Sequence, residues 1–204
     1  MRKFITFEGV DGSGKSTQAK LLADYLSRSG NKVFLTREPG EGRLGELIRT
    51  EILDRKDISI DPYAELCLFC ADRAQHVREL ILPKLRDGYT VICDRYYDST
   101  LAYQGSGREI DPDLVHRMAT ASSLGVEPDI TFFLSIPVPQ ALLRLEGRQK
   151  EKNRMDEESS EFHRRVDEGY RHLIGKKIPR IKVIEATVSP GEIHMEIRGF
   201  FGEL

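Results

Sequence analysis

Residues 9–16, GVDGSGKS, match the pattern G-x-x-x-x-G-K-[ST] at every fixed position, and we call them the glycine loop. Glycines let successive backbone N–H groups turn toward one point, which makes a phosphate site at a helix N-terminus. In such loops the lysine reaches the outer phosphates of a nucleoside triphosphate, and the serine ligates Mg²⁺. The residues predicted to hold the triphosphate are Gly9, Val10, Asp11, Gly12, Ser13, Gly14, Lys15, Ser16 and Thr17.

Two further clusters follow apolar runs that are typical of strands. In TREPG (36–40), Arg37 comes directly after such a run, and in DRYYDS (94–99) Asp94 and Arg95 do the same. Ligands of open α/β sheets bind outside the carboxyl ends of the strands. Arg37 is therefore predicted to hold the phosphate of an acceptor, and Asp94 to assist Mg²⁺. Arg95 is predicted to bridge the donor and acceptor phosphates. A solvated surface arginine is the alternative for Arg37.

A fourth cluster, FCADR at 69–73, lies in a helical pattern. Phe69 and Arg73 are four residues apart, so they share one helix face, where a ring could stack on a base and a guanidinium could bind its carbonyl edge. A core phenylalanine and an exposed arginine would satisfy the same pattern. Tyr103 and Gln104, in what we expect to be a glycine-rich loop, could line the sugar and base.

Residues 144–158, RLEGRQKEKNRMDEE, are dense in charge. As a lid, this segment could close its arginines over a transferred phosphoryl group and exclude water, which would otherwise hydrolyse the donor. A solvated charged loop is the alternative.

Short apolar runs alternate with helical patterns along the chain. Strands are predicted at 3–8, 32–36, 91–93, 130–134 and 181–186, and helices at 14–29, 111–124, 138–147, 159–177 and 190–202. Continuous apolar strands separated by helices indicate a parallel sheet covered on both faces, hence a three-layer α/β fold. In the long segment 43–87, Pro62 is expected to start a helix and Pro83 to interrupt it.

Composition narrows the class of protein. The 204 residues form one domain, 1–204, with a net charge of −2 that argues against a nucleic-acid polymer or a membrane surface as partner. No apolar stretch could span a bilayer, so we expect a cytoplasmic protein. Arginines outnumber lysines by 20 to 11, which suits phosphate binding. Cys67 and Cys70 are expected to be buried small residues and not zinc ligands.

Assembled, these motifs make the sequence similar to the thymidylate kinase family, over essentially the whole chain. The resemblance is carried by FEGVDGSGKSTQ (7–18), TREPG (36–40), FCADRAQH (69–76), CDRYYDSTLAYQG (93–105) and FHRRVDEGY (162–170). It implies a P-loop kinase fold with a five-stranded parallel sheet and a lid. It also implies the reaction ATP + dTMP → ADP + dTDP with Mg²⁺, in dTTP biosynthesis, carried out by a homodimer.

The resemblance further implies roles for individual residues. Phe69 would stack on thymine and Arg73 would contact its O4, while Arg37 and Arg95 would hold the dTMP phosphate. The remaining dTMP-binding residues would be Asp11 near the 3′-hydroxyl, Tyr103 at the 2′ position, and Ser99 and Gln104 at the base. Mg²⁺ would be ligated by Ser16 and Asp94, and catalysis would involve Lys15, Arg95 and Asp11.

Members of this family carry a catalytic arginine either in the glycine loop or in the lid. Gly12 stands where the loop arginine would be, so this chain resembles the lid type, with Arg148 and Arg154 as the two candidates. Glu41 replaces a second glycine that commonly follows TREPG.

Features of other nucleotide-binding classes are missing from the sequence. A GTPase should carry N-K-x-D, but Asn31 and Lys32 are followed by Val-Phe, and a motor ATPase is typically larger. A different acceptor nucleotide or nucleoside, and a nucleotide-dependent switch without transfer, remain as rivals. The second set of phosphate and base residues argues against the switch.

Overall fold

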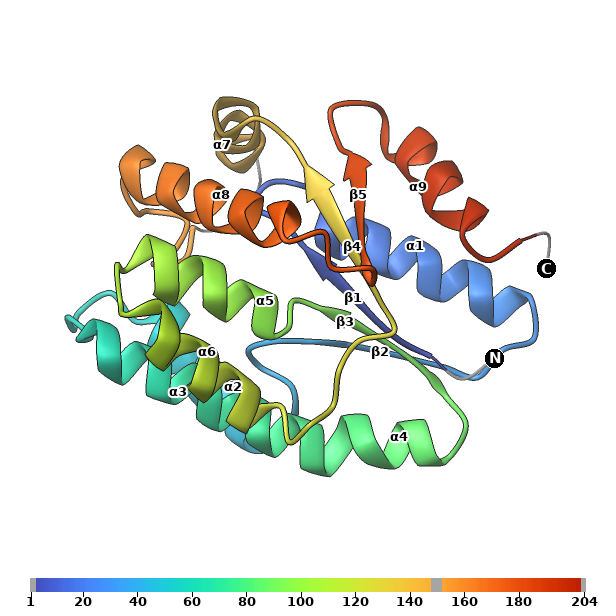
Figure 1. Cartoon of the computed structure of the whole chain (residues 1–204), viewed down its shortest axis with the longest axis horizontal. Coiled ribbons are helices and arrows are strands. Elements are labelled where there is room, and N and C mark those ends of the chain that lie inside the picture. Colours follow the sequence, from blue (N-terminus) through green and yellow to red (C-terminus); the bar gives the residue numbers. More distant parts are fainter. Residues whose placement is uncertain (1–2, 148–151, 203–204) are drawn as a thin grey trace.

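The computed structural model describes residues 3–147 and 152–202. Its centre is a five-stranded parallel sheet in the order β2-β3-β1-β4-β5 (Figure 1). The strands are β1 (Phe4–Glu8), β2 (Val33–Arg37), β3 (Thr90–Asp94), β4 (Ile130–Ser135) and β5 (Ile181–Glu185). All five predicted strands are confirmed, with ends that differ by no more than one residue. Every residue of the central strand β1 is buried, including the polar Thr6 and Glu8, because the sheet is covered on both faces.

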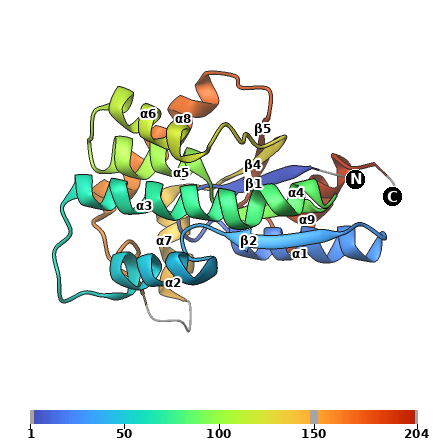
Figure 2. The ribbon, with the colours of Figure 1, turned by 90° about the horizontal axis from the view of Figure 1, so that it is seen from below.

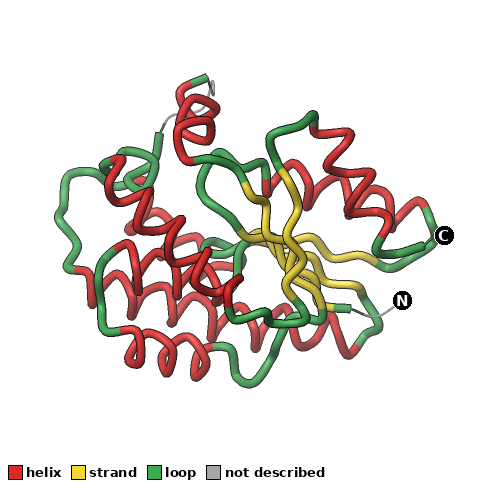
Figure 3. Tube along the Cα trace, turned by 45° about the horizontal axis from the view of Figure 1, so that its top comes forward, coloured by secondary structure: helices red, strands yellow, loops and turns green. Residues whose placement is uncertain are grey.

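Helices cover both faces of the sheet, which confirms the three-layer α/β fold (Figure 3). Figure 1 shows α1 and α9 packed side by side on one face, and α3 and α4 on the other. The helices are α1 (Lys15–Arg28), α2 (Gly42–Arg49), α3 (Pro62–His76), α4 (Leu82–Arg86), α5 (Tyr97–Thr100), α6 (Pro112–Ser122), α7 (Val138–Glu146), α8 (Ser160–Gly175) and α9 (Pro190–Gly199). Within the described part of the chain, no helix is both long and apolar enough to cross a membrane.

The two prolines of segment 43–87 act as predicted. Asp61 caps α3 by accepting a hydrogen bond from the backbone N–H of Tyr63 at 2.8 Å, with Pro62 in the first turn. Pro83 lacks an N–H, and the chain widens just before it into a π-helical turn, Val77–Ile81, between α3 and α4. α3 and α4 are thus two parts of one long rod (Figure 2).

Two expectations about local structure are wrong. Tyr103 and Gln104 do not lie in a loop, because Leu101–Gly107 continues α5 as a π-helical segment that packs along α8. Gly107 is needed for this contact, since a Cβ there would lie 2.8 Å from the Phe162 ring and from Val166. Cys67 is exposed, because it lies on the outer side of α3, whereas Cys70 is buried as expected.

The register of the sheet brings distant motifs to one edge. Arg37, the last residue of β2, is paired with Asp94 at the end of β3, and Asp94 is also paired with Phe7 of β1. The glycine loop, TREPG and DRYYDS therefore all leave the sheet at its carboxyl edge, where they share a pocket with residues of α3 and α5.

Candidate active site

A pocket of about 550 Å³ lies at this carboxyl edge. Twelve of the predicted site residues line it: Asp11, Lys15, Ser16, Thr17, Arg37, Phe69, Arg73, Asp94, Arg95, Ser99, Tyr103 and Gln104. The pocket thus contains residues from all the clusters that were expected to bind phosphate or base, together with Lys152, Asn153, Met155 and Asp156 of the lid segment.

The glycine loop has the backbone that its sequence predicts. Gly9, Gly12 and Gly14 all have positive φ, and Gly14 is the N-cap of α1. Lys15 is 6% exposed, and its ammonium group donates to the Val10 carbonyl at 2.8 Å. Burial, reinforced by the nearby Arg95 charge, lowers the pKa of Lys15 to about 8. The loop therefore holds a desolvated cation whose charge is stabilised only in part.

Gly12 has no room for a side chain. A Cβ at this position would overlap the carbonyl oxygen of Ala141 in α7, and φ at Gly12 is +86°. The first turns of α7 close this side of the loop, so an arginine could not be accommodated here without moving the helix. This packing agrees with the absence of a basic residue at this position of the glycine loop.

The two predicted magnesium ligands lie together. The Ser16 hydroxyl donates to Asp94 Oδ2, while Asp94 Oδ1 is buried and has no hydrogen-bond partner among the described residues. A buried carboxylate oxygen without a partner is destabilising unless something binds it. Hydroxyl and carboxylate oxygens are ligands that Mg²⁺ prefers, so these residues fit a magnesium ion.

Arg95 is the centre of the pocket's hydrogen-bond network. Its guanidinium donates to Asp11 at 2.5 Å, to the Tyr103 hydroxyl at 2.9 Å and to Ser99 at 3.1 Å, and it also lies over the Tyr103 ring. Although burial disfavours the ionised Asp11 carboxyl, the Arg95 charge holds its pKa well below the usual range. Arg95 has a φ of +74°, so the chain turns sharply after β3 to aim this side chain into the pocket.

Glu8 lies beneath this network and was not predicted. It is 1% exposed, and its carboxylate accepts from the Tyr96 N–H at 2.8 Å, from Ser99 at 2.6 Å and from Tyr170 at 2.8 Å. Burial and the neighbouring Asp98 raise the pKa of Glu8 to about 7. The sequence signal was the acid that directly precedes the glycine loop.

Glu8→Gln should therefore change how stability depends on pH. The folded pKa lies above the unfolded value of 4.5, so the folded protein binds more protons between about pH 4.5 and 7, and wild-type stability falls as pH rises through this window. The variant should lack this fall in stability, because the glutamine amide cannot ionise. The hydroxyl oxygens of Ser99 and Tyr170 can accept hydrogen bonds from the amide N–H groups. Urea unfolding from pH 5 to 8 measures the effect, and parallel curves for the two proteins would contradict it.

Phe69 and Arg73 differ in their surroundings. Phe69 is half-buried in the pocket wall, whereas Arg73 is 2% exposed and forms an ion pair with Glu38, from its Nε to Oε2 at 2.8 Å. The interpretation of Arg73 as an exposed arginine is thus wrong. Glu38 is 5% exposed. It was not predicted to be a site residue, although it stands next to Arg37 in TREPG.

Arg49 is a third arginine, beside Arg37 and Arg95, at the part of the pocket predicted to bind phosphate, and the sequence did not reveal it. It lines the pocket from the last turn of α2 and donates to the Pro39 carbonyl at 3.0 Å. Burial and the Arg37 charge lower its pKa. Within the described residues, neither Arg37 nor Arg49 forms an ion pair with a carboxylate. Two neighbouring cations without acidic partners favour an anionic ligand.

The lid segment is described in part. Arg148 lies outside the described residues. Arg154 binds Glu65 of α3 at 2.7 Å and the Ile52 carbonyl at 2.8 Å, and it is not among the residues that line the pocket. Arg108 binds the same Glu65 carboxylate at 3.0 Å. This end of the lid segment is thus bound to α3 through Glu65.

A glycine loop at the end of a central parallel strand, with a second set of cations and a ring in the same pocket, defines the class of P-loop kinases that act on small acceptors. The family model for thymidylate kinase matches residues 7–197. The chain belongs to the thymidylate kinase family.

Individual relatives agree with this family. A thymidylate kinase from Desulfovibrio desulfuricans is 44% identical over 96% of this chain and 93% of the relative. One from Carboxydothermus hydrogenoformans is 45% identical over 97% and 96%. The crystal structure of thymidylate kinase from Ehrlichia chaffeensis superposes with a TM-score of 0.80 at 35% identity and covers 99% of both chains.

Proposed function

We propose that this protein transfers the γ-phosphoryl group of ATP to dTMP, with Mg²⁺, and so makes dTDP for dTTP synthesis. One observation carries the proposal: a single pocket is lined by Asp11, Lys15 and Ser16 of the glycine loop and by a second set of groups suited to phosphate and base. A nucleotide switch has no use for that second set. The chain would act as one kinase domain, 1–204, with its lid at about 144–158.

The phosphates of ATP and dTMP would be bound by cationic side chains from several elements. The glycine loop and Lys15 would bind those of ATP, while Arg37, Arg49 and Arg95 would bind that of dTMP. Phosphoryl transfer depends mainly on positioning and on neutralising charge, so no protein nucleophile is required. Lys15 and Arg95 would stabilise the charge on the transferred group, and Asp11 would keep the Arg95 guanidinium in place through their ion pair.

Ser16 and Asp94 would hold the magnesium ion, which would neutralise phosphate charge when bound. The unpartnered Asp94 Oδ1 supports this role. Asp94 would also orient the Ser16 hydroxyl through their hydrogen bond.

The nucleoside would be bound by the α3 and α5 side of the pocket. Phe69 would stack on thymine, Arg73 would donate to O4, and Ser99 and Gln104 would complete the base site. Tyr103, whose hydroxyl donates to Asp11 at 2.6 Å, would fill the space beside the 2′ carbon and disfavour a ribose. Asp11 would lie near the 3′-hydroxyl.

Closure of the lid would complete the site. For Arg154 to reach the phosphoryl group, it would exchange Glu65 for the phosphate oxygens, and Arg108 would keep Glu65 paired. Arg148 is the other candidate. We also propose that the enzyme is a cytoplasmic homodimer, which sedimentation at several concentrations would test.

A coupled assay of ADP release tests the proposed reaction. With ATP and Mg²⁺, dTMP should give a turnover well above those of dUMP, dCMP, dAMP, dGMP and thymidine. Each kcat/KM ratio measures the discrimination directly. Absence of turnover with dTMP, while another acceptor reacts, would overturn the assignment of the substrate.

Phe69→Ala should raise the KM for dTMP by about tenfold to a hundredfold, since stacking on an aromatic ring contributes roughly 1–3 kcal/mol per base. The KM for ATP should be unchanged because Phe69 lies on the acceptor side. Steady-state kinetics with each substrate varied in turn measures both values. An equal rise in the two KM values would mean that Phe69 is a core residue only.

A further inference from the structure

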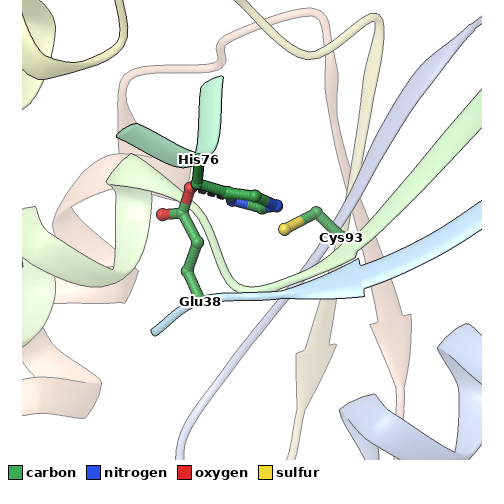
Figure 4. Close-up of side chains that lie close together, drawn as sticks. All are labelled: Glu38, His76 and Cys93. Carbon is green, nitrogen blue, oxygen red and sulfur yellow. Dashed lines mark hydrogen bonds and ion pairs between the residues drawn. The ribbon is translucent and has the colours of Figure 1, made fainter. Parts of the chain in front are cut away.

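A buried hydrogen-bonded cluster lies behind Arg73, outside the residues that the proposed reaction uses. Figure 4 shows Glu38, His76 and Cys93 converging from the end of β2, from α3 and from β3. His76 is 2% exposed and Cys93 is fully buried. Neither lines the pocket, so any effect of His76 on the substrate must pass through another side chain.

Both ring nitrogens of His76 have partners. Nδ1 lies 2.9 Å from Glu38 Oε1, and Nε2 lies 2.7 Å from the Thr36 hydroxyl. An ionised carboxylate only accepts hydrogen bonds, so we assign the proton to Nδ1 and let Thr36 donate to Nε2. Thr36 thereby fixes the tautomer in which His76 donates to Glu38.

Glu38 passes this orientation on to Arg73. One carboxylate oxygen accepts from His76 and the other accepts from Arg73 Nε at 2.8 Å. The Glu38 and Arg73 side chains are each 3% exposed, so water cannot replace these bonds. Burial alone would lower the pKa of Arg73, but the neighbouring groups, Glu38 first among them, outweigh burial and the pKa is raised, so the guanidinium stays charged.

Arg73 Nη1 belongs to the guanidinium group at the end of this series of hydrogen bonds. It is buried and has no hydrogen-bond partner in the part of the chain that the structure describes, although Arg73 lines the pocket. A buried cationic donor left unpaired is costly, which favours a ligand acceptor at this point. With Nε held by Glu38, the direction of the Nη1 donor is fixed by the protein and not by the ligand.

The same three side chains could in principle bind a metal, since their ligand atoms lie within 4.8 Å of one another. A zinc site needs four ligands with bonds of about 2.0–2.3 Å. Here both His76 nitrogens are used, Glu38 is shared with Arg73, and Cys93 donates to the Arg95 carbonyl at 3.0 Å. The geometry favours a hydrogen-bond relay over a metal site.

We propose that His76, held by Thr36, is a positioning residue that orients Glu38 and through it the guanidinium of Arg73 toward the carbonyl at position 4 of the acceptor base. The inference rests on the proposed function, in which Arg73 meets this base. A rigid N–H donor can donate to a carbonyl oxygen but has no acceptor for the amino group that cytosine carries at the same position. The relay therefore sets selectivity for thymine over cytosine.

Four variants separate positioning from general stability. His76→Leu removes both ring nitrogens, Thr36→Val removes only the outer hydroxyl, and His76→Asn keeps an amide donor that can face Glu38. Thr6→Val is the matched control, because it deletes a buried hydroxyl whose partner is Thr131, away from the pocket. For each variant, kcat and KM for ATP, dTMP and dCMP are measured together with the melting temperature.

His76→Leu should raise the KM for dTMP about tenfold and lower the ratio of kcat/KM for dTMP over dCMP about tenfold, the equivalent of 1.4 kcal/mol. The KM for ATP should not change. Thr36→Val should show a smaller shift in the same direction, and His76→Asn should recover most of the ratio. Thr6→Val should leave the ratio unchanged even where its melting temperature falls equally.

Two outcomes would overturn the relay. One is a ratio for His76→Leu equal to that of Thr6→Val, and another is a stoichiometric zinc ion in the purified protein, measured by mass spectrometry. Arg73→Ala distinguishes this failure from failure of the proposed function. If wild type does not use dTMP, or if Arg73→Ala leaves the KM for dTMP unchanged, the assignment of the base site is at fault and not the relay.

Discussion

Lys15→Ala should lower kcat by about 10³-fold or more, which corresponds to roughly 4 kcal/mol of transition-state stabilisation at 1.36 kcal/mol per factor of ten. Lys15 is nearly buried, and among the described residues its ammonium group donates only to the Val10 carbonyl and, more weakly, to Ser13 at 3.4 Å. Its charge is therefore poorly stabilised until phosphate binds. Single-turnover kinetics with saturating ATP and dTMP measures the chemical step directly.

Lys20→Ala is the matched control, because Lys20 is an exposed lysine on the same helix. It should leave kcat unchanged. Linkage gives a second readout: the folded pKa of Lys15, about 8, lies below the unfolded value of 10.5, so the unfolded chain binds more protons between these values. Wild-type stability gains from this as pH rises through that window, and Lys15→Ala should lack the gain. A kcat near that of wild type would refute the assignment of the glycine loop.

Arg95→Lys should lower kcat/KM for dTMP by about 10²–10³-fold, the usual effect of losing a preorganised donor to a developing charge. Lysine keeps the positive charge but not the planar fork that contacts Asp11, Tyr103 and Ser99 at once, nor its stacking on the Tyr103 ring. We expect the ATPase activity without acceptor to change much less. Initial rates with each substrate varied would show the difference.

Arg180→Lys is a suitable control, since Arg180 pairs with Asp98 and lies over the Tyr97 ring outside the pocket. It loses the same type of contacts and should keep kcat/KM for dTMP. Acid unfolding adds a check: Asp11 has a depressed folded pKa, so its contribution to stability is present above about pH 3.8 and is lost as pH falls below it. Arg95→Lys should reduce this contribution and Arg180→Lys should not. Equal losses of activity in the two variants would contradict a specific role for Arg95.

Much of the pocket could be predicted because its motifs directly follow strands. The carboxyl ends of parallel strands meet at one edge, so Arg37 and Asp94 had to come close, and their register confirms it. Arg49 could not be found in this way. It ends an amphipathic helix whose sequence contains no motif, and only the packing of α2 beside TREPG brings it to the pocket.

By itself, the sequence determined the strands, most helices, the glycine loop and the identity of the family, because these depend on patterns within a few consecutive residues. Tertiary structure alone decided which partner each buried charge has. Arg73 pairs with Glu38, which is 35 residues away in the sequence. Arg95 pairs with Asp11 at a separation of 84 residues, and Arg154 pairs with Glu65 at a separation of 89 residues. Composition and spacing show that charges are present, but in a dry interior their direction and ionisation depend on the few groups that folding places within hydrogen-bond distance.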